Sequence, residues 1–365
     1  MKRLGIATVM TLVLSCGGVG SGGVGSSDAV TLGAVAPWGT GYGTQIRRAI
    51  ELAVEEINKG GGINGKDVKV VFKDDSANGA RGVAMAQELV ADKSIVAVIG
   101  HANSVVSVAS ARVYDGNIVA ISPSSSSPAL TGVSPWVFRT INSDSLNGIE
   151  LAKFATRRGH KRAALMYEND AFGRGLVAMF KRAFDGQVVG VDPISAATRD
   201  FEPFVSYYKK VKPDLVFVVG TEVSGVAFIK EARRQQLDAE LLGADGWSGV
   251  TIGGALMDGV VIGAPFSTDS PRPQAQKFVA TFKAKYNTLP DGFAACAYDA
   301  VMLVARAIRE VGPDRQKVRD WLASMRDDYD GVTGRFKLGA NGDPMGKTLV
   351  MTRMKNGVFT VEGGQ

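Results

Sequence analysis

The sequence predicts an α/β protein made of two doubly wound, Rossmann-like lobes. Three observations support this expectation. Apolar, β-branched stretches alternate with segments in which apolar residues recur at helical spacing, as in βαβ units. The alternation starts again at Leu146, and a length of 365 residues suits two domains. One predicted strand, Ile95–Gly100, contains no polar residue, which is typical of a parallel sheet covered by helices on both faces.

In the first block, strands and helices alternate without interruption. The expected strands are Val30–Val35, Val68–Phe72, Ile95–Gly100 and Ile118–Ile121. The expected helices are Thr44–Asn58, Ala80–Ala91 and Val105–Tyr114. The first helix shows the pattern most clearly, because its apolar residues fall on one face.

The second block repeats this order. Its expected strands are Ala163–Tyr167, Val188–Val191, Leu215–Val219, Leu241–Gly243 and Val260–Ile262. Its expected helices are Leu146–Arg157, Gly175–Phe184, Phe201–Val211 and Gly225–Gln235. Three helices and two strands follow, at Gln274–Tyr286, Phe293–Val311, Arg315–Met325, Gly334–Leu338 and Thr348–Met354.

The N-terminus reads as an export signal. Lys2 and Arg3 precede the apolar run Leu4–Leu14, which is too short for a bilayer span of ~20 residues but suits a signal peptide. Val13–Cys16 resembles a bacterial lipobox, so we expect residues 1–15 to be a lipoprotein signal peptide and Cys16 to be lipidated. Residues 16–29 then form the lipidated cysteine and a Gly/Ser tether. A secretory signal with an incidental cysteine is the alternative, and both place the folded part outside the cytoplasm.

Composition excludes several classes of protein. Two cysteines cannot build a disulfide framework, and two histidines with them leave no cluster for a zinc site. The net charge of +6 comes from scattered basic residues, which predicts a solvated surface and no nucleic-acid partner. Gly60–Lys66 is nearly a phosphate-binding loop, but Asp67 replaces the required hydroxyl and the segment follows a helix. With no nucleophile elbow or dinucleotide loop either, we expect neither an enzyme nor a cofactor.

Polar turns follow several predicted strands, where ligands bind in such sheets. His101–Ser104 and Ser122–Pro128 offer hydroxyls and helix N-terminal N–H groups that suit a carboxylate, or they form polar loops that cap their own helices. Asp245 follows another strand and suits an ammonium group, or it is an ordinary turn residue. The lone His101 is expected to be structural, and Asp74–Asp75 a solvated turn.

These stretches together resemble the leucine/isoleucine/valine-binding family of periplasmic receptors for ABC importers. The resemblance covers Val30 to about Val361. Its most specific stretches are Ala49–Lys66, Val98–Ser104, Ile121–Leu130, Tyr167–Gly175 and Ala297–Ala300. It implies a type I periplasmic-binding fold that closes about a hinge on a small amino acid, most simply an aliphatic or branched-chain one. The closed form would dock on an ABC permease in the membrane.

The resemblance also implies roles for individual residues. Ser104 and Ser126 match groups that bind the ligand carboxylate, and the carbonyl of Ser124 and the side chain of Asp245 match groups that bind its ammonium. The expected pocket wall is Tyr42, Phe172, Thr221, Trp247 and Tyr298. Phe172 stands where the family has a tyrosine, and Thr221 replaces an aromatic residue, whose space Trp247 could refill. The family's disulfide between the regions 74–78 and 101–104 is missing here.

Three crossovers between the lobes are implied, near Ser143, Phe266 and Met351. Lobe 1 would then comprise residues 30–143 and 267–351, and lobe 2 residues 144–266 and 352–365. Two alternatives stay open. The chain could be a ligand sensor of the same fold, or a receptor for an amide, a urea or an aromatic acid.

Overall fold

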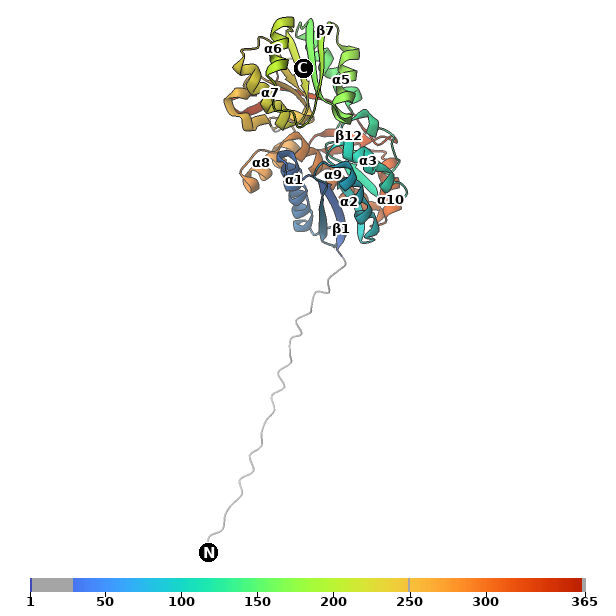
Figure 1. The fold of residues 1–365 in the computed structure, drawn as a ribbon. Helices are drawn as coiled ribbons and strands as arrows, with labels where there is room; N and C mark the ends of the chain where they lie inside the picture. Colours follow the sequence, from blue (N-terminus) through green and yellow to red (C-terminus); the bar gives the residue numbers. More distant parts are fainter. Residues whose placement is uncertain (2–28, 249, 363–365) are drawn as a thin grey trace.

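The computed structural model describes Met1, residues 29–248 and residues 250–362. The predicted signal peptide and the predicted lipidation site at Cys16 lie outside these residues, apart from Met1. Two α/β lobes are stacked end to end, with α1, α2, α3 and α9 in one lobe and α5, α6 and α7 in the other (Figure 1). Within the described part of the chain, none of the helices combines the length and the apolar character needed to cross a membrane.

Lobe 1 contains a parallel five-stranded sheet in the order β2-β1-β3-β4-β5. The strands are β1 (Val30–Ala36), β2 (Val68–Asp74), β3 (Ile95–Gly100), β4 (Val119–Ser122) and β5 (Val137–Arg139). The helices are α1 (Gly41–Lys59), α2 (Gly79–Ala91), α3 (Ser104–Tyr114), α8 (Pro273–Tyr286), α9 (Gly292–Val311) and α10 (Arg315–Ala323). Neighbouring residues of β3 belong to different cores, since Ile99 packs with α1 and α9 and Val98 packs with α2 and α3. The sheet is therefore covered on both faces, as its apolar strands predict.

Lobe 2 contains a seven-stranded sheet in the order β15-β14-β10-β9-β8-β6-β7. Its parallel strands are β6 (Arg162–Glu168), β7 (Gln187–Ile194), β8 (Leu215–Val219), β9 (Glu240–Gly243) and β10 (Val261–Ala264). Its helices are α4 (Asp144–Arg157), α5 (Ala171–Ala183), α6 (Glu202–Val211) and α7 (Glu222–Arg234). Short 3₁₀ segments lie at η1 (Pro128–Leu130), η2 (Asp245–Trp247) and η3 (Val250–Met257).

The chain passes between the two sheets three times, after β5, after β10 and before β14 (Val350–Lys355). β14 and β15 (Val358–Val361) extend the second sheet as antiparallel strands. Val350 already lies opposite Ala264 of β10, so the last passage comes before residue 350. A small separate sheet, β11 (Tyr329–Gly331), β12 (Gly334–Leu338) and β13 (Pro344–Met345), belongs to the segment that precedes this passage.

The predicted fold class is confirmed, and the predicted strands and helices are present with ends shifted by a few residues. β5, β11, β13 and β15 were not predicted. They have only two to four residues each, which is too few for an alternating pattern to stand out.

The segment Gly60–Lys66 forms a turn after α1, as expected, and not a phosphate loop. Gly61, Gly62 and Gly65 have positive φ angles of 92°, 74° and 79°. A Cβ atom on Gly62 would lie 2.2 Å from the carbonyl oxygen of Lys66, so this turn requires glycine there.

Candidate ligand-binding site

A pocket lies between the lobes, at the carboxyl ends of strands from both sheets. Lobe 1 contributes Tyr42, Ala102, Asn103, Ser104, Ser124 and Phe293. Lobe 2 contributes Asp170, Phe172, Thr221, Asp245 and Gly246. Most of these residues sit in turns that directly follow β3, β4, β6, β8 and β9. The strand ends of two sheets thus converge on one space, as doubly wound folds allow.

Six of the predicted site residues line this pocket. They are Tyr42, Ser104, Ser124, Phe172, Thr221 and Asp245. The sequence did not single out Asn103, Asp170 and Phe293 for the pocket, although each lies within a few residues of a residue or motif that it did single out. Phe293 begins α9, and its ring meets the Tyr42 ring edge to face at a centroid distance of 6.2 Å.

Three predicted site residues do not line the pocket. Trp247 is fully buried in the core of lobe 2, where Cβ atoms on Gly225 and Gly243 would lie 2.4 and 2.3 Å from its indole ring. The ring of Tyr298 packs against the ring of Phe278 at a centroid distance of 4.8 Å, and its hydroxyl donates to the carboxylate of Glu56. Trp247 and Tyr298 therefore pack in the cores of the lobes and do not form the pocket wall.

Ser126 is the third of these residues. Its side chain is buried, and its carbonyl accepts a hydrogen bond of 2.8 Å from the backbone N–H of Asp144. Its hydroxyl has no hydrogen-bond partner among the described residues. Ser126 therefore lies behind the pocket surface, at the first passage between the lobes.

The N-terminus of α3 forms the anion-attracting side of the pocket. Asn103 occupies the capping position, but its side chain accepts from the hydroxyl of Tyr42 at 3.0 Å and caps no N–H of α3. Ser104 follows, and its Oγ accepts from the N–H of Ser127 at 3.1 Å, which leaves the hydroxyl proton free to point elsewhere. A helix start without a side-chain cap presents unsatisfied N–H groups and a partial positive charge to the pocket.

Serine hydroxyls join the turn after β3 to the turn after β4. Ser124 Oγ donates to the carbonyl of Ala102 at 2.9 Å, and Ser122 Oγ donates to the carbonyl of His101 at 2.6 Å. The buried guanidinium of Arg139 also supports this loop, because it donates to the carbonyls of Ser125 and Ser127 at 3.1 and 2.9 Å. Much of the serine run therefore stabilises its own loop, which was the alternative left open by the sequence.

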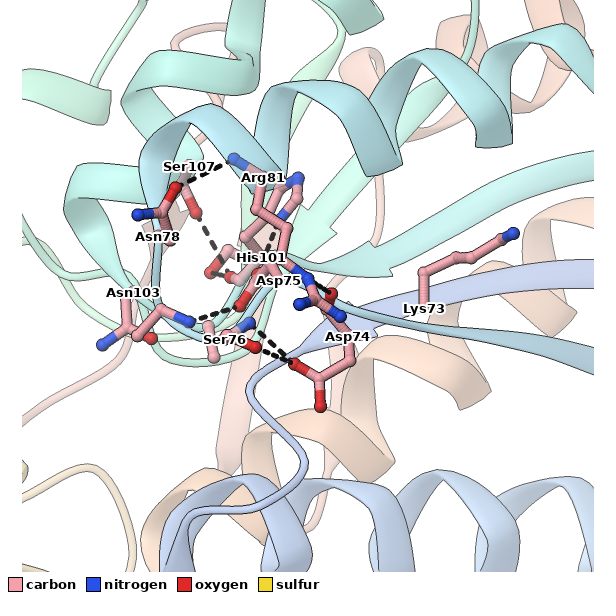
Figure 2. Close-up of polar contacts among 12 residues, drawn as sticks. Lys73, Asp74, Asp75, Ser76, Asn78, Arg81, His101, Asn103 and Ser107 are labelled. Carbon is pink, nitrogen blue, oxygen red and sulfur yellow. Dashed lines mark hydrogen bonds and ion pairs between the residues drawn. The ribbon is translucent and has the colours of Figure 1, made fainter.

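A buried polar chain anchors the same turn from the other side. His101 Nδ1 lies 2.7 Å from Asp75 Oδ2 (Figure 2). The hydroxyl of Tyr114 lies 2.9 Å from His101 Nε2. The side chains of both His101 and Asp75 are 0% exposed, so the expectation of a solvated turn at Asp75 was wrong. This contact joins the two loops in which the family's disulfide is missing, and burial raises the pKa of Tyr114.

Asp245 forms the acidic side of the pocket. It is 2% exposed, its Oδ1 accepts from the N–H of Gly246 at 3.0 Å, and its Oδ2 has no partner among the described residues. Burial raises the pKa of Asp245 to about 7. The pocket thus holds a carboxylate whose charge nothing on the described lining neutralises.

Asp144 is a functional candidate that the sequence did not reveal. It begins α4, is fully buried, and its Oδ2 also has no partner among the described residues. Burial, together with the charge of Asp245, raises the pKa of Asp144 well above its usual range. The charge of Asp245 therefore disfavours ionisation of Asp144, although the two residues are distant in sequence.

The rest of the lining carries no positive charge among its described residues. Asp170 is a second acid of the wall, and burial raises its pKa. The described residues also contain no group of three or more His, Cys, Asp or Glu side chains that could hold a metal ion. The pocket thus combines an anion-attracting helix start, buried carboxylates and aromatic rings.

Similar known proteins include binding proteins for amino acids. A family model described as periplasmic binding protein matches residues 29–358. The leucine-, isoleucine-, valine-, threonine-, and alanine-binding protein of Pseudomonas aeruginosa is 28% identical over 331 residues, which cover 88% of this chain and 85% of that protein. An isoleucine complex of a branched-chain amino acid transporter substrate binding protein from Streptococcus pneumoniae gives a TM-score of 0.85 at 28% identity, covering 91% and 97% of the two chains.

A related structure has a different ligand. The benzoate complex of an ABC transporter solute binding protein from R. palustris gives a TM-score of 0.84 at 25% identity, covering 91% of this chain and 95% of that one. The matched span of the family model includes all the pocket-lining residues of both lobes. The chain therefore belongs to the periplasmic binding protein family, and it is a solute-binding protein, not an enzyme.

Proposed function

We propose that this protein is the extracytoplasmic receptor of an ABC importer and that it captures a small α-amino acid, aliphatic or branched-chain, between its closing lobes. The names of its relatives support an amino-acid ligand. The distribution of charge in the pocket supports it independently.

The observation that carries this proposal is the buried Oδ2 of Asp245, which has no hydrogen-bond partner among the described residues. A buried carboxylate without a partner is unfavourable, and the ammonium of an amino acid would neutralise it. The N-terminus of α3 and the hydroxyl of Ser104 lie on the opposite lobe of the pocket, where they suit the carboxylate of the same ligand. A zwitterion fits both sides, whereas a simple acid or amine fits only one.

The proposed head-group contacts extend the expectations from the sequence. Ser104 would bind the carboxylate, with Ser126 acting through its loop, and the carbonyl of Ser124 would assist Asp245 at the ammonium. Tyr42, Phe172 and Thr221 would surround the ligand side chain.

Closure of the lobes would complete the site. Residues 30–143 with 267–349, and residues 144–266 with 350–362, are the units that we propose to move about the three passages. Val350 and Met351, expected in lobe 1, are counted with lobe 2 because they pair with β10. Ser127 Oγ of lobe 1 donates to the carbonyl of Ala171 in lobe 2 at 2.8 Å, so one direct hydrogen bond already links the two lobes beside the pocket. The ligand would stabilise the closed form by its higher affinity for that form.

A thermal-shift screen of the mature domain tests the proposal. A ligand at about 100 times its Kd adds about 2.7 kcal/mol of stability. We expect shifts with small aliphatic L-amino acids and none with their amides or with the corresponding amines. Shifts with aromatic acids alone would contradict the assignment of Asp245 to an ammonium.

Aromatic acids are the second candidate ligands, because one relative with 25% identity is seen with benzoate. The pKa of Asp245, raised to about 7, would let this group lose its charge at neutral pH and tolerate a ligand without an ammonium. Titrations with leucine and with benzoate in parallel separate the two candidates.

Lipid anchoring at Cys16 and docking on a permease complete the proposal. Mass spectrometry of the N-terminal peptide from membranes should find a diacylglyceryl group on Cys16, and Cys16→Ala should release the protein. A sensor of the same fold would bind the same ligand, but deleting its gene would leave uptake of that ligand unchanged.

A further inference from the structure

We propose that Thr221, held by the buried carboxylate of Glu168, determines which side chains the pocket accepts. Thr221 offers an acceptor oxygen to a hydroxyl on the ligand, so the receptor binds threonine at least as tightly as valine, which has the same shape. This inference rests on the proposed function, because it requires an α-amino acid in the pocket.

Thr221 lies in the turn between β8 and α7 and lines the pocket. It occupies the capping position of α7, yet its side chain accepts no N–H of that helix. Instead, its backbone N–H and its Oγ1 both donate to Glu168 Oε1, each at 3.0 Å. One carboxylate oxygen therefore fixes both the backbone and the side chain of this residue.

Glu168 ends β6 and is 3% exposed. The same Oε1 also accepts from Ser224 Oγ at 2.6 Å, so three donors from one turn converge on it. A Cβ atom on Gly220 would lie 2.4 Å from Ser224 Oγ and 3.0 Å from Glu168 Oε1. This arrangement thus depends on glycine at position 220 and leaves Thr221 little freedom to rotate.

The hydrogen bond to Glu168 decides how the hydroxyl of Thr221 can interact with a ligand. A hydroxyl has one proton and two lone pairs, and Thr221 commits its proton to Glu168. Towards a ligand, Thr221 can therefore only accept a hydrogen bond. The nearby carboxylate of Asp170, which accepts from the N–H of Gly173 at 2.8 Å, is an acceptor as well.

The aromatic part of the wall leaves the rest of the side-chain space apolar. Phe172 and Phe293 carry no polar atom, and Tyr42 directs its hydroxyl to Asn103. A β-branched side chain with one hydroxyl matches such a wall, because its methyl group would pack against the aromatic rings and its hydroxyl would donate a hydrogen bond to Thr221. Threonine has this side chain, and valine is the same shape without the donor.

Calorimetric titration with threonine and with valine tests the inference. In Thr221→Val the oxygen is lost and the shape is kept, so we expect the affinity for threonine relative to valine to fall about 5- to 10-fold, as for one hydrogen bond. Thr221→Ser keeps the oxygen and should leave the ratio within about 2-fold of the wild type. Thr281→Val on α8, where the hydroxyl donates only to Lys277, is the matched control.

Variants of Glu168 separate positioning from folding. Glu168→Gln keeps an acceptor oxygen and should preserve the ratio, whereas Glu168→Leu removes it and should lower the ratio as Thr221→Val does. A purely structural defect would weaken both ligands equally. An unchanged ratio in Thr221→Val overturns the inference.

The ligands that the wild-type protein binds distinguish a failure of this inference from a failure of the proposed function. Protein that binds valine but not threonine overturns the role of Thr221 and leaves the amino-acid receptor standing. Protein that binds neither but binds benzoate overturns both.

Discussion

His101 Nδ1 lies 2.7 Å from Asp75 Oδ2, and both side chains are shielded from solvent. These residues are 26 positions apart, and they join the loop after β2 to the ligand-binding turn after β3. The backbone carbonyl of His101 accepts a hydrogen bond from the hydroxyl of Ser122. The contact between His101 and Asp75 therefore also supports the serine-rich loop after β4. A polar contact thus connects the two loops in which the resemblance to the leucine/isoleucine/valine-binding family implies a disulfide that this sequence lacks.

Removing this contact should destabilise the protein. Asp75→Ala removes the hydrogen-bond partner of His101 Nδ1, and breaking a buried pair costs about 3–5 kcal/mol. We expect a loss of this size in urea denaturation monitored by circular dichroism. Asp74→Ala, in the more exposed neighbouring position, is the control and should cost far less. Equal effects of the two variants would show that Asp75 contributes no special stability.

Asp245 should matter for binding and not for folding. Asp245→Ala removes the proposed partner of the ligand ammonium, so we expect a loss of about 2–5 kcal/mol in calorimetric binding energy. The unliganded protein should not become less stable by this amount, because the Oδ2 of Asp245 loses no partner that belongs to the described part of the chain. Asp258→Ala, on the surface of the same lobe, is the control. Unchanged affinity would remove Asp245 from the site.

Binding should depend on pH through the same carboxylate. Burial raises the pKa of Asp245 from 3.8 to about 7, and an ammonium ligand requires the ionised form. We therefore expect affinity to rise by up to about tenfold per pH unit as the pH approaches 7 from below, and to level off above it. Titrations in buffers of different ionisation enthalpy should detect proton release on binding. A flat profile, or one that persists in Asp245→Asn, would contradict this assignment.

The stability of the unliganded protein should follow the opposite trend. A carboxyl with a raised pKa binds more protons in the folded state than in the unfolded state, so stability falls as the pH rises from about 4 to 7. Asp291 contributes as well, because burial raises its pKa to about 7. In thermal denaturation measured between pH 4 and 7, the Tm of Asp245→Asn and of Asp291→Asn should each fall less steeply with pH than the Tm of the wild type. If neither substitution changes this pH dependence, other groups cause it.

Ser104 should contribute directly to the affinity for the ligand carboxylate. Ser104→Ala removes a hydroxyl at the start of α3, and a hydrogen bond to a charged group is worth about 1.5–3 kcal/mol. We expect a loss of this size in calorimetry, with Ser324→Ala on the exposed end of α10 as the control. An effect near zero would mean that backbone N–H groups alone hold the carboxylate.

Much of the site followed from the sequence because strand ends can be identified locally. Ser104, Ser124, Thr221 and Asp245 each come within four residues of the end of an apolar strand, and all four line the pocket. Trp247 also follows such a strand and was expected in the wall. Its ring packs in the core of lobe 2 against Gly243 and against Gly225, and Gly225 comes from a separate part of the chain.

By itself, the sequence determined the fold class, the repeated βαβ order and the turns that form the site, because periodicity and strand ends are properties of neighbouring residues. Only the tertiary structure decided that Asp75 is buried with His101, that the charge of Asp245 acts on Asp144, and that Glu168 accepts a hydrogen bond from the hydroxyl of Thr221. Each of these pairs joins separate segments of the chain. Their burial and their electrostatic coupling depend on how the elements pack, which local sequence patterns do not specify.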